Sequence, residues 1–424
     1  MTNPRRSSNS LLTGASTYIF ASTINASIPF FLLPILTRYL EPAEYGEVAV
    51  YQVWVALIGA LCGLSVHGAV TRKYYDYDEP EKKMGEFISA CILVLIFSTA
   101  AFAVLLLPIA GWISKNIGLS AQWIWIGILF AFCNFLIQLR LGQWQVRKKS
   151  QKFGAFQVSQ SLVNMLVSLL LVVFFSLGVT GRITGNTVAV VFFGVIGVLL
   201  LWREGLLKPS WRPDLMKEAI SFGVPLIPHV IGGFLLLTVD RAIISSQLGL
   251  DAAGYYMVAA QMAMVMGLIV EGINKAYTPW LYEGLKRNDE SEKRFIVKLT
   301  YAYGVVLLAI AAFAFLVGGP ALMFIAGDKY QQSADLIGWM ILGKAFHGMY
   351  YVVCSYIFYM KKTLVIAKIT IVTGALNAAL LFILSNEFGL LGAAWAMCVG
   401  MMLQFSLTWH YASKVVSMPW LLRR

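Results

Sequence analysis

The sequence predicts an all-α polytopic membrane protein with 12 transmembrane helices in two six-helix lobes. Of its 424 residues, 59% are hydrophobic and only 13% are charged, whereas about a quarter of a soluble chain would be charged. Mostly apolar runs of 18 or more residues recur along the chain, and each can cross a hydrocarbon core of about 30 Å. They are helical in length, unlike the roughly ten-residue alternating segments of an outer-membrane barrel.

The apolar runs predict the helices in order. The first follows a basic start, as the core of a signal peptide would, but it continues to about residue 37 and is therefore predicted to be retained. We expect helices at 12–37, 47–67, 87–110, 122–140, 155–178, 185–202, 222–246, 254–274, 296–318, 336–358, 366–385 and 390–410.

The distribution of basic residues predicts the orientation. The net charge is +12, and all but six of the 33 Lys and Arg residues fall in alternate connections or at the termini. The positive-inside rule therefore places both termini in the cytoplasm. The charge is explained as a topology signal, with attraction to anionic lipid as a by-product, and nucleic acid need not be invoked. The six exceptions are Arg38, Lys115, Arg182, Arg241, Lys329 and, inside a helix, Lys344.

The chain repeats weakly at half its length, which predicts lobes at residues 1–210 and 211–424. Six helices in each half let both halves begin on the same side of the membrane, as in transporters with parallel repeats. The matching positions are Leu40 and Gly46 with Leu248 and Gly254, and Asn164, Gly178 and Gly181 with Asn377, Gly389 and Gly392.

The helices that open the two halves both contain proline pairs, Pro29 with Pro34 and Pro225 with Pro228. Interrupted helices at corresponding positions of two repeats indicate a transport pathway. Proline kinks also occur in purely structural bundles, so this alternative stays open.

Several of these stretches resemble a known family. They are ILTRYLEPAEYGEV after the first helix, RKKSQKFGAFQVSQSLVNM before and in the fifth, and FGVPLIPH, VDRAIIS and LGLDAAGYY across the seventh and eighth. Their order resembles the polysaccharide-transporter branch of the MOP superfamily, which includes Wzx-type flippases for lipid-linked O-antigen units.

The resemblance spans the whole chain and implies two lobes forming a V-shaped central cavity in the bacterial inner membrane. It also implies an undecaprenyl-pyrophosphate-linked oligosaccharide cargo, turned from the cytoplasmic to the periplasmic leaflet, with polymerase and glycosyltransferase partners in the same pathway. It supplies no fixed set of binding residues.

No complete catalytic, metal or cofactor motif is visible in the sequence. GWMILGKA at 338–345 matches G-x-x-x-x-G-K, but Ala345 replaces the required Ser or Thr and no strand precedes it. Five cysteines without a CxxC spacing and four scattered histidines predict neither a metal site nor a disulfide framework. We therefore expect a transporter without a cofactor, not an enzyme.

Lys344 and His347 are candidate cavity residues. They are three residues apart, on one face of the tenth predicted helix. An intramembrane cation roughly 12 Å from the helix end, at 1.5 Å per residue, could attract the cargo's diphosphate. Snorkelling to the nearer surface is the alternative.

Asp240 and Arg241 lie close to the periplasmic end of the seventh predicted helix. Adjacent helical residues point about 100° apart, so each is expected to find a different partner. The hypothesis pairs Asp240 with Arg38 as a gate latch and leaves Arg241 to receive the cargo's phosphates. The alternative is that both lie among lipid headgroups.

Three further polar positions complete the candidate set. Glu271 precedes Lys275 by four residues, which predicts an ion pair on the helix and, alternatively, an ion-coupling role for Glu271 together with Asp240. Asn134 and Gln138 on the fourth helix carry amides suited to sugar hydroxyls, although polar residues also join membrane helices.

The same residues distinguish the expected transporter from proteins with rival functions. A multidrug extruder of the superfamily would need cavity carboxylates for cationic cargo, yet Arg38, Arg241 and Lys344 outnumber them. A lipid II flippase resembles this chain less at 36–48 and 222–256. A membrane glycosyltransferase would need acids on large periplasmic loops, and the longest predicted one, 319–335, holds only Asp328 and Asp335.

Overall fold

The structure, a computed structural model, describes residues 24–25, 27–76, 80–360 and 362–420 and is helical almost throughout them. The chain divides into two compact units, each considered by itself: residues 1–32 with 47–231, and residues 33–46 with 232–424. The lobes predicted from the sequence repeat, 1–210 and 211–424, stay a prediction.

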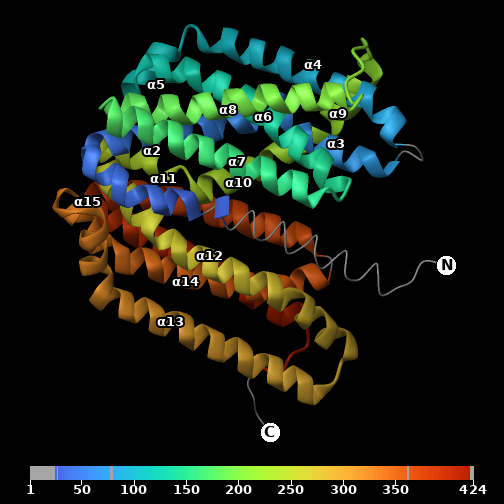
Figure 1. Ribbon diagram of the computed structural model, residues 1–424. Helices are drawn as coiled ribbons and strands as arrows, with labels where there is room; N and C mark the ends of the chain where they lie inside the picture. Colours follow the sequence, from blue (N-terminus) through green and yellow to red (C-terminus); the bar gives the residue numbers. More distant parts are fainter. Residues whose placement is uncertain (1–23, 26, 77–79, 361, 421–424) are drawn as a thin grey trace. The chain divides into compact units, whose positions relative to one another are not determined.

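The helices of the first unit follow a helical segment at 27–39 (Figure 1). In order they are α2 (Pro42–Leu61), η1 (Cys62–Ser65), α3 (His67–Lys73), η2 (Tyr74–Asp76), α4 (Pro80–Leu106), α5 (Ala110–Ile117), α6 (Ala121–Val146), α7 (Ser150–Leu169), η3 (Leu170–Phe174), α8 (Gly178–Arg203), α9 (Pro213–Gly223) and η4 (Val224–Leu226). One core cluster of this unit joins α3, α4, α6, α8 and α9 around Phe87, Ile88 and Leu139.

Apart from residues 33–46, the second unit consists of the chain from Gly232 onward, which starts within α10 (Ile227–Leu237). It continues with α11 (Asp240–Leu248), α12 (Leu250–Arg287), α13 (Glu290–Ala326), η5 (Asp328–Tyr330), α14 (Gln331–Tyr359) and α15 (Thr363–Val415). A core cluster around Leu281, Ile296 and Tyr356 joins α12, α13, α14 and α15.

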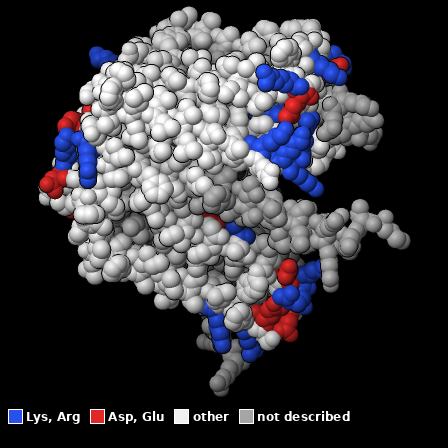
Figure 2. Space-filling view, in the orientation of Figure 1, with Lys and Arg blue, Asp and Glu red and all other residues white. Residues whose placement is uncertain are grey.

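Ten helices in the described ranges are long and apolar enough to cross a membrane. Charged side chains gather near helix ends, and uncharged side chains cover most of the helix lengths (Figure 2). Half of the predicted helix 12–37 lies outside the described residues. The predicted helices 366–385 and 390–410 are both contained in α15.

Two predictions about helix boundaries are wrong. The interruption predicted at Pro225 and Pro228 is present as the short η4 turn, but the seventh predicted helix, 222–246, does not continue to 246, because a turn at 238–239 separates α10 from α11. The predicted loop 319–335 is almost entirely helical, since Leu322 and Ala326 are buried and extend α13 to its packed end.

Each unit contains a sharply turned helix hairpin at the matching glycines of the repeat. Gly178 and Gly389 both have positive φ, 53° and 60°, which glycine adopts without a steric penalty. A Cβ on Gly181 would lie tightly against the backbone of Leu171, at 3.0 Å, and a Cβ on Gly392 would clash with the carbonyl oxygen of Leu384, at 1.9 Å. The internal repeat read from the sequence therefore has a structural counterpart, and α15 folds back on itself at Gly389 (Figure 1).

The other repeated glycines form a reciprocal contact in the second unit. A Cβ on Gly46 would overlap the carbonyl group of Leu250, and a Cβ on Gly254 would overlap that of Pro42. Glycine is required here because only a bare Cα lets the two helix starts approach so closely.

We expect Gly254→Ala to destabilise the purified protein by about 1–3 kcal/mol, because the added methyl group must displace backbone. Gly272→Ala is the matched control on the same helix, since a Cβ there meets no atom within 4 Å. The control should be neutral or slightly stabilising. Thermal unfolding measures both, and equal melting temperatures for the two variants would contradict the close contact.

Candidate functional site

Lys344 of α14 is the centre of a charged cluster in the second unit. Its side chain is partly buried and lies over Gly267 of α12, where an added Cβ would be 3.9 Å from Lys344 Cδ. The charges of Arg241 and Asp240 act on it. Because α14 begins at Gln331, Lys344 lies about 20 Å along the helix at 1.5 Å per residue, deeper than the predicted 12 Å, which makes snorkelling less favourable.

His347, one turn further along α14, continues the polar face. Its ring lies 4.6 Å from the Tyr351 ring and 5.6 Å from the Tyr350 ring. The nearly buried Gln404 of α15 is its polar neighbour. His347 Nδ1 and Gln404 Oε1 are buried without a hydrogen-bond partner. Buried polar atoms normally have a hydrogen-bond partner, which an ordered water or a polar ligand can supply here.

Asp240 and Arg241 pair with each other, which corrects the expectation that neighbouring residues cannot pair. Asp240 Oδ1 accepts a hydrogen bond from the Arg241 backbone nitrogen at 3.0 Å and lies 3.3 Å from Arg241 Nη1. The 100° argument fails because α11 begins at Asp240 and no regular helix precedes the pair. The buried Tyr256 of α12 also lies close enough to interact with Asp240.

The proposed latch partner is not paired in the structure. Arg38 is exposed at the end of the 27–39 segment, and these two described residues, Arg38 and Asp240, form no ion pair. Asp240 instead pairs with Arg241, and its charge acts on Lys344.

Glu271 and Lys275 form the predicted ion pair on α12, with Lys275 Nζ 2.8 Å from Glu271 Oε1. Both side chains are exposed, so this pair contributes little stability. Asn134, partly buried, and Gln138, exposed, lie on α6 in the first unit. Within the second unit, the structure thus relates Asp240, Arg241, Lys344 and His347 through an ion pair and mutual electrostatic effects.

Sequence reasoning missed Tyr256 and Gln404. The signal for Gln404 was available, because it is a lone amide within the apolar stretch MMLQFSLTW. Tyr256 follows another tyrosine near a helix start, a position where an interfacial aromatic belt is the ordinary explanation.

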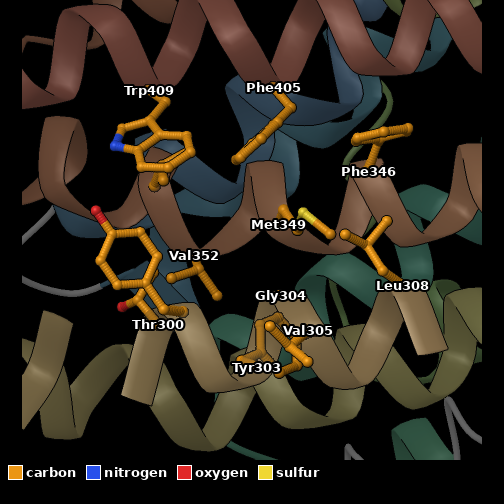
Figure 3. A pocket seen from close by; sticks show the side chains of 12 residues that line it. Thr300, Tyr303, Gly304, Val305, Leu308, Phe346, Met349, Val352, Phe405 and Trp409 are labelled. Atoms are coloured by element: carbon orange, nitrogen blue, oxygen red, sulfur yellow. The ribbon is translucent and has the colours of Figure 1, made fainter. Parts of the chain in front are cut away.

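An apolar pocket of about 460 Å³ lies among α13, α14 and α15. Phe346 and Met349 of α14 meet Phe405 and Trp409 of α15 and Leu308 of α13 around it (Figure 3). At about 100° per residue, Phe346 and Met349 lie on the side of α14 away from Lys344 and His347. One helix therefore presents charge on one side and an apolar cavity on the other.

The chain was compared with known proteins. A family model described as polysaccharide biosynthesis protein matches residues 11–285. The chain is 24% identical over 414 residues to a putative O-antigen transporter of Shigella flexneri, covering 93% of this chain and 96% of that protein. It is 22% identical over 380 residues to the Lsg locus putative protein 1 of Haemophilus influenzae, covering 87% and 90%.

Solved structures share the fold. The lipid II flippase MurJ in an inward closed conformation matches with a TM-score of 0.72 and 14% identity, covering 91% of this chain and 87% of that one. An inward-facing MATE-family multidrug resistance transporter of the MOP superfamily matches with a TM-score of 0.68 and 14% identity, covering 92% and 94%. At such identity these likenesses establish a MOP-type fold alone.

Proposed function

Because the chain belongs to the polysaccharide biosynthesis protein family, we propose that it is a flippase, not an enzyme. Its cargo is an undecaprenyl-pyrophosphate-linked oligosaccharide repeat unit of O-antigen or a related surface polysaccharide. It moves this unit from the cytoplasmic to the periplasmic leaflet by alternating access. The observation that carries the proposal is the pair of cations Lys344 and Arg241, together with the apolar pocket that lies on the side of α14 away from Lys344.

The cluster has the chemistry that a diphosphate-sugar head requires. Arg241 pairs with the carboxylate of Asp240, and Lys344 lies within the electrostatic reach of both charges, so two cations and one carboxylate leave an excess positive charge for an anionic head. His347 and Gln404 add buried hydrogen-bonding atoms suited to sugar hydroxyls. The apolar pocket suits part of the polyprenyl tail.

The proposed flippase has the arrangement inferred from the sequence. Its chain crosses the inner membrane of a bacterial cell twelve times in two six-helix lobes, and both termini lie in the cytoplasm. Arg38, Asn134 and Gln138 belong to the cargo path, and Asp240 and Glu271 belong to gating or ion coupling. Polymerase and glycosyltransferases of the same pathway are its partners.

Multidrug extrusion and lipid II transport are the alternatives within the fold. A cationic drug would favour a cavity with excess carboxylate, which the Lys344 cluster opposes. The relative named as a putative O-antigen transporter supports a surface-glycan cargo over lipid II.

Deleting the gene from its host tests the proposal in cells. We expect surface glycan to be lost and its lipid-linked repeat unit to accumulate in the cytoplasmic leaflet. An added glycosidase should then reach the repeat unit only in permeabilised cells. Restoring the wild-type gene is the control. Unchanged surface glycan together with new sensitivity to cationic drugs would instead identify an extruder.

A further inference from the structure

A second cationic cluster lies in the first unit, where α6 ends and α8 ends. Arg140 of α6 is 0% exposed, the guanidinium stacks 4.0 Å from the centre of the Trp144 ring, and Nη2 lies 2.6 Å from Glu204 Oε1. That ion contact lacks the angles of a hydrogen bond, because Nη2 counts among the buried atoms without a hydrogen-bond partner. A fully buried arginine is expensive unless its charge and its N–H groups are matched.

A single carboxylate, that of Glu204, lies close to three cations in this cluster. Arg147 Nη1 lies 3.8 Å from Glu204 Oε2, and Lys152 Nζ lies 3.5 Å from Glu204 Oε1. Burial raises the pKa of Glu204, but the adjacent Arg140 guanidinium and the charges of Lys149 and Lys152 lower it further, so the net shift is downward. Glu204 is therefore ionised at neutral pH and neutralises only one of its three cations.

The cluster also has a surplus of buried polar atoms. Arg140 Nε and Nη1, Arg147 Nε and Nη2, both amide atoms of Gln143 and Trp144 Nε1 are buried without a hydrogen-bond partner. Gln143 is 0% exposed. Most of these atoms are donors, and arginine forks match the oxygens of phosphate with two parallel hydrogen bonds.

We propose that Arg140, Arg147 and Lys152, with Gln143 and Trp144, bind the phosphate of a membrane lipid at the cytoplasmic end of the first unit. The basic connection Arg147–Lys152 belongs to the side that the positive-inside rule assigns to the cytoplasm. Basic pockets between membrane helices on this side hold anionic headgroups. Lys152, with a 58% exposed side chain, receives the phosphate at the surface, and the two arginines hold it below.

The phosphate has two sources, an anionic phospholipid or the diphosphate of a lipid-linked cargo. Native mass spectrometry of the purified full chain separates them by titration with phosphatidylglycerol, with neutral, phosphate-free diacylglycerol and with undecaprenyl diphosphate. Similar binding of both anionic lipids indicates a general headgroup site. A clear preference for undecaprenyl diphosphate assigns the site to cargo loading.

Two substitutions with opposite effects test the site. Arg147→Gln should weaken binding of the anionic lipids about tenfold, the equivalent of one charge-assisted hydrogen bond. Glu204→Gln should strengthen it, because the carboxylate competes with the phosphate for the same cations. Arg203→Gln is the matched control, since Arg203 is exposed beside the cluster and should bind as the wild type does.

A purely structural ion cluster behaves differently. Glu204→Gln would then only lower the melting temperature, and Arg147→Gln would bind lipid as Arg203→Gln does. Either result, or equal wild-type binding of neutral and anionic lipids, would overturn the proposal. These binding measurements need no transport, so their failure would leave the flippase proposal untouched.

Discussion

Lys344→Ala is expected to reduce surface-glycan export at least about tenfold at unchanged protein level, the effect of removing one charge-assisted contact from the rate-determining path. Lys344→Arg should retain a measurable part. The reason is that a flexible diphosphate-sugar requires charge more than a particular shape, and Lys344 lies on α14 within the reach of the Asp240 and Arg241 charges.

Lys329→Ala is the matched control for this prediction. Lys329 is the basic residue of η5 and pairs with Glu41, with a 48% exposed side chain, so its loss should change export little. Surface glycan per cell, normalised to the amount of membrane protein, measures all three variants. Full export by Lys344→Ala would mean that this side chain has no part in transport.

Asp240→Asn is expected to be comparably damaging. Its carboxylate pairs with Arg241, lies close to Tyr256 and acts electrostatically on Lys344, so its loss leaves the charges of these two cations unbalanced. Breaking a buried pair costs about 3–5 kcal/mol. The side chains here retain 15% and 17% exposure, so solvent screening places the effect below that range, and export should fall about tenfold.

Charge exchange identifies the partner of Asp240. Asp240→Arg should abolish export, and the double exchange Asp240→Arg with Arg241→Asp should restore part of it, because the pair re-forms within the same turn. Exchanging charges at 38 and 240 should restore nothing, since Arg38 is exposed and does not pair with Asp240. Rescue by the 38–240 exchange alone would show that the Arg38 latch operates in another conformation.

The features predicted well from sequence are those set by local chemistry. Long apolar runs defined most helices, and Gly46, Gly178, Gly254 and Gly389 marked the repeat because their positions tolerate little else. Helix ends at 222–246 and 319–335 were misjudged, because the packing of Leu322 and the turn before Asp240 override composition.

The candidate site was only partly predictable. Lys344 and His347 stood out as polar residues in an apolar run. Their companions Tyr256 and Gln404 come from helices distant in the sequence, and only the folded unit brings them together. The ion pair of Asp240 with Arg241 depends on a break in the helix that an ideal helical wheel omits.

The most direct test of the flippase is translocation by the purified full chain in liposomes. The vesicles contain a fluorescent undecaprenyl-diphosphate oligosaccharide, and an impermeant glycosidase is added outside. Without protein, only the outer-leaflet lipid should be cleaved. With the wild type, under a proton or sodium gradient where one is needed, the inner pool should also become accessible, and Lys344→Ala should slow this markedly. A wild type that exposes no more lipid than empty vesicles under every gradient would contradict the account.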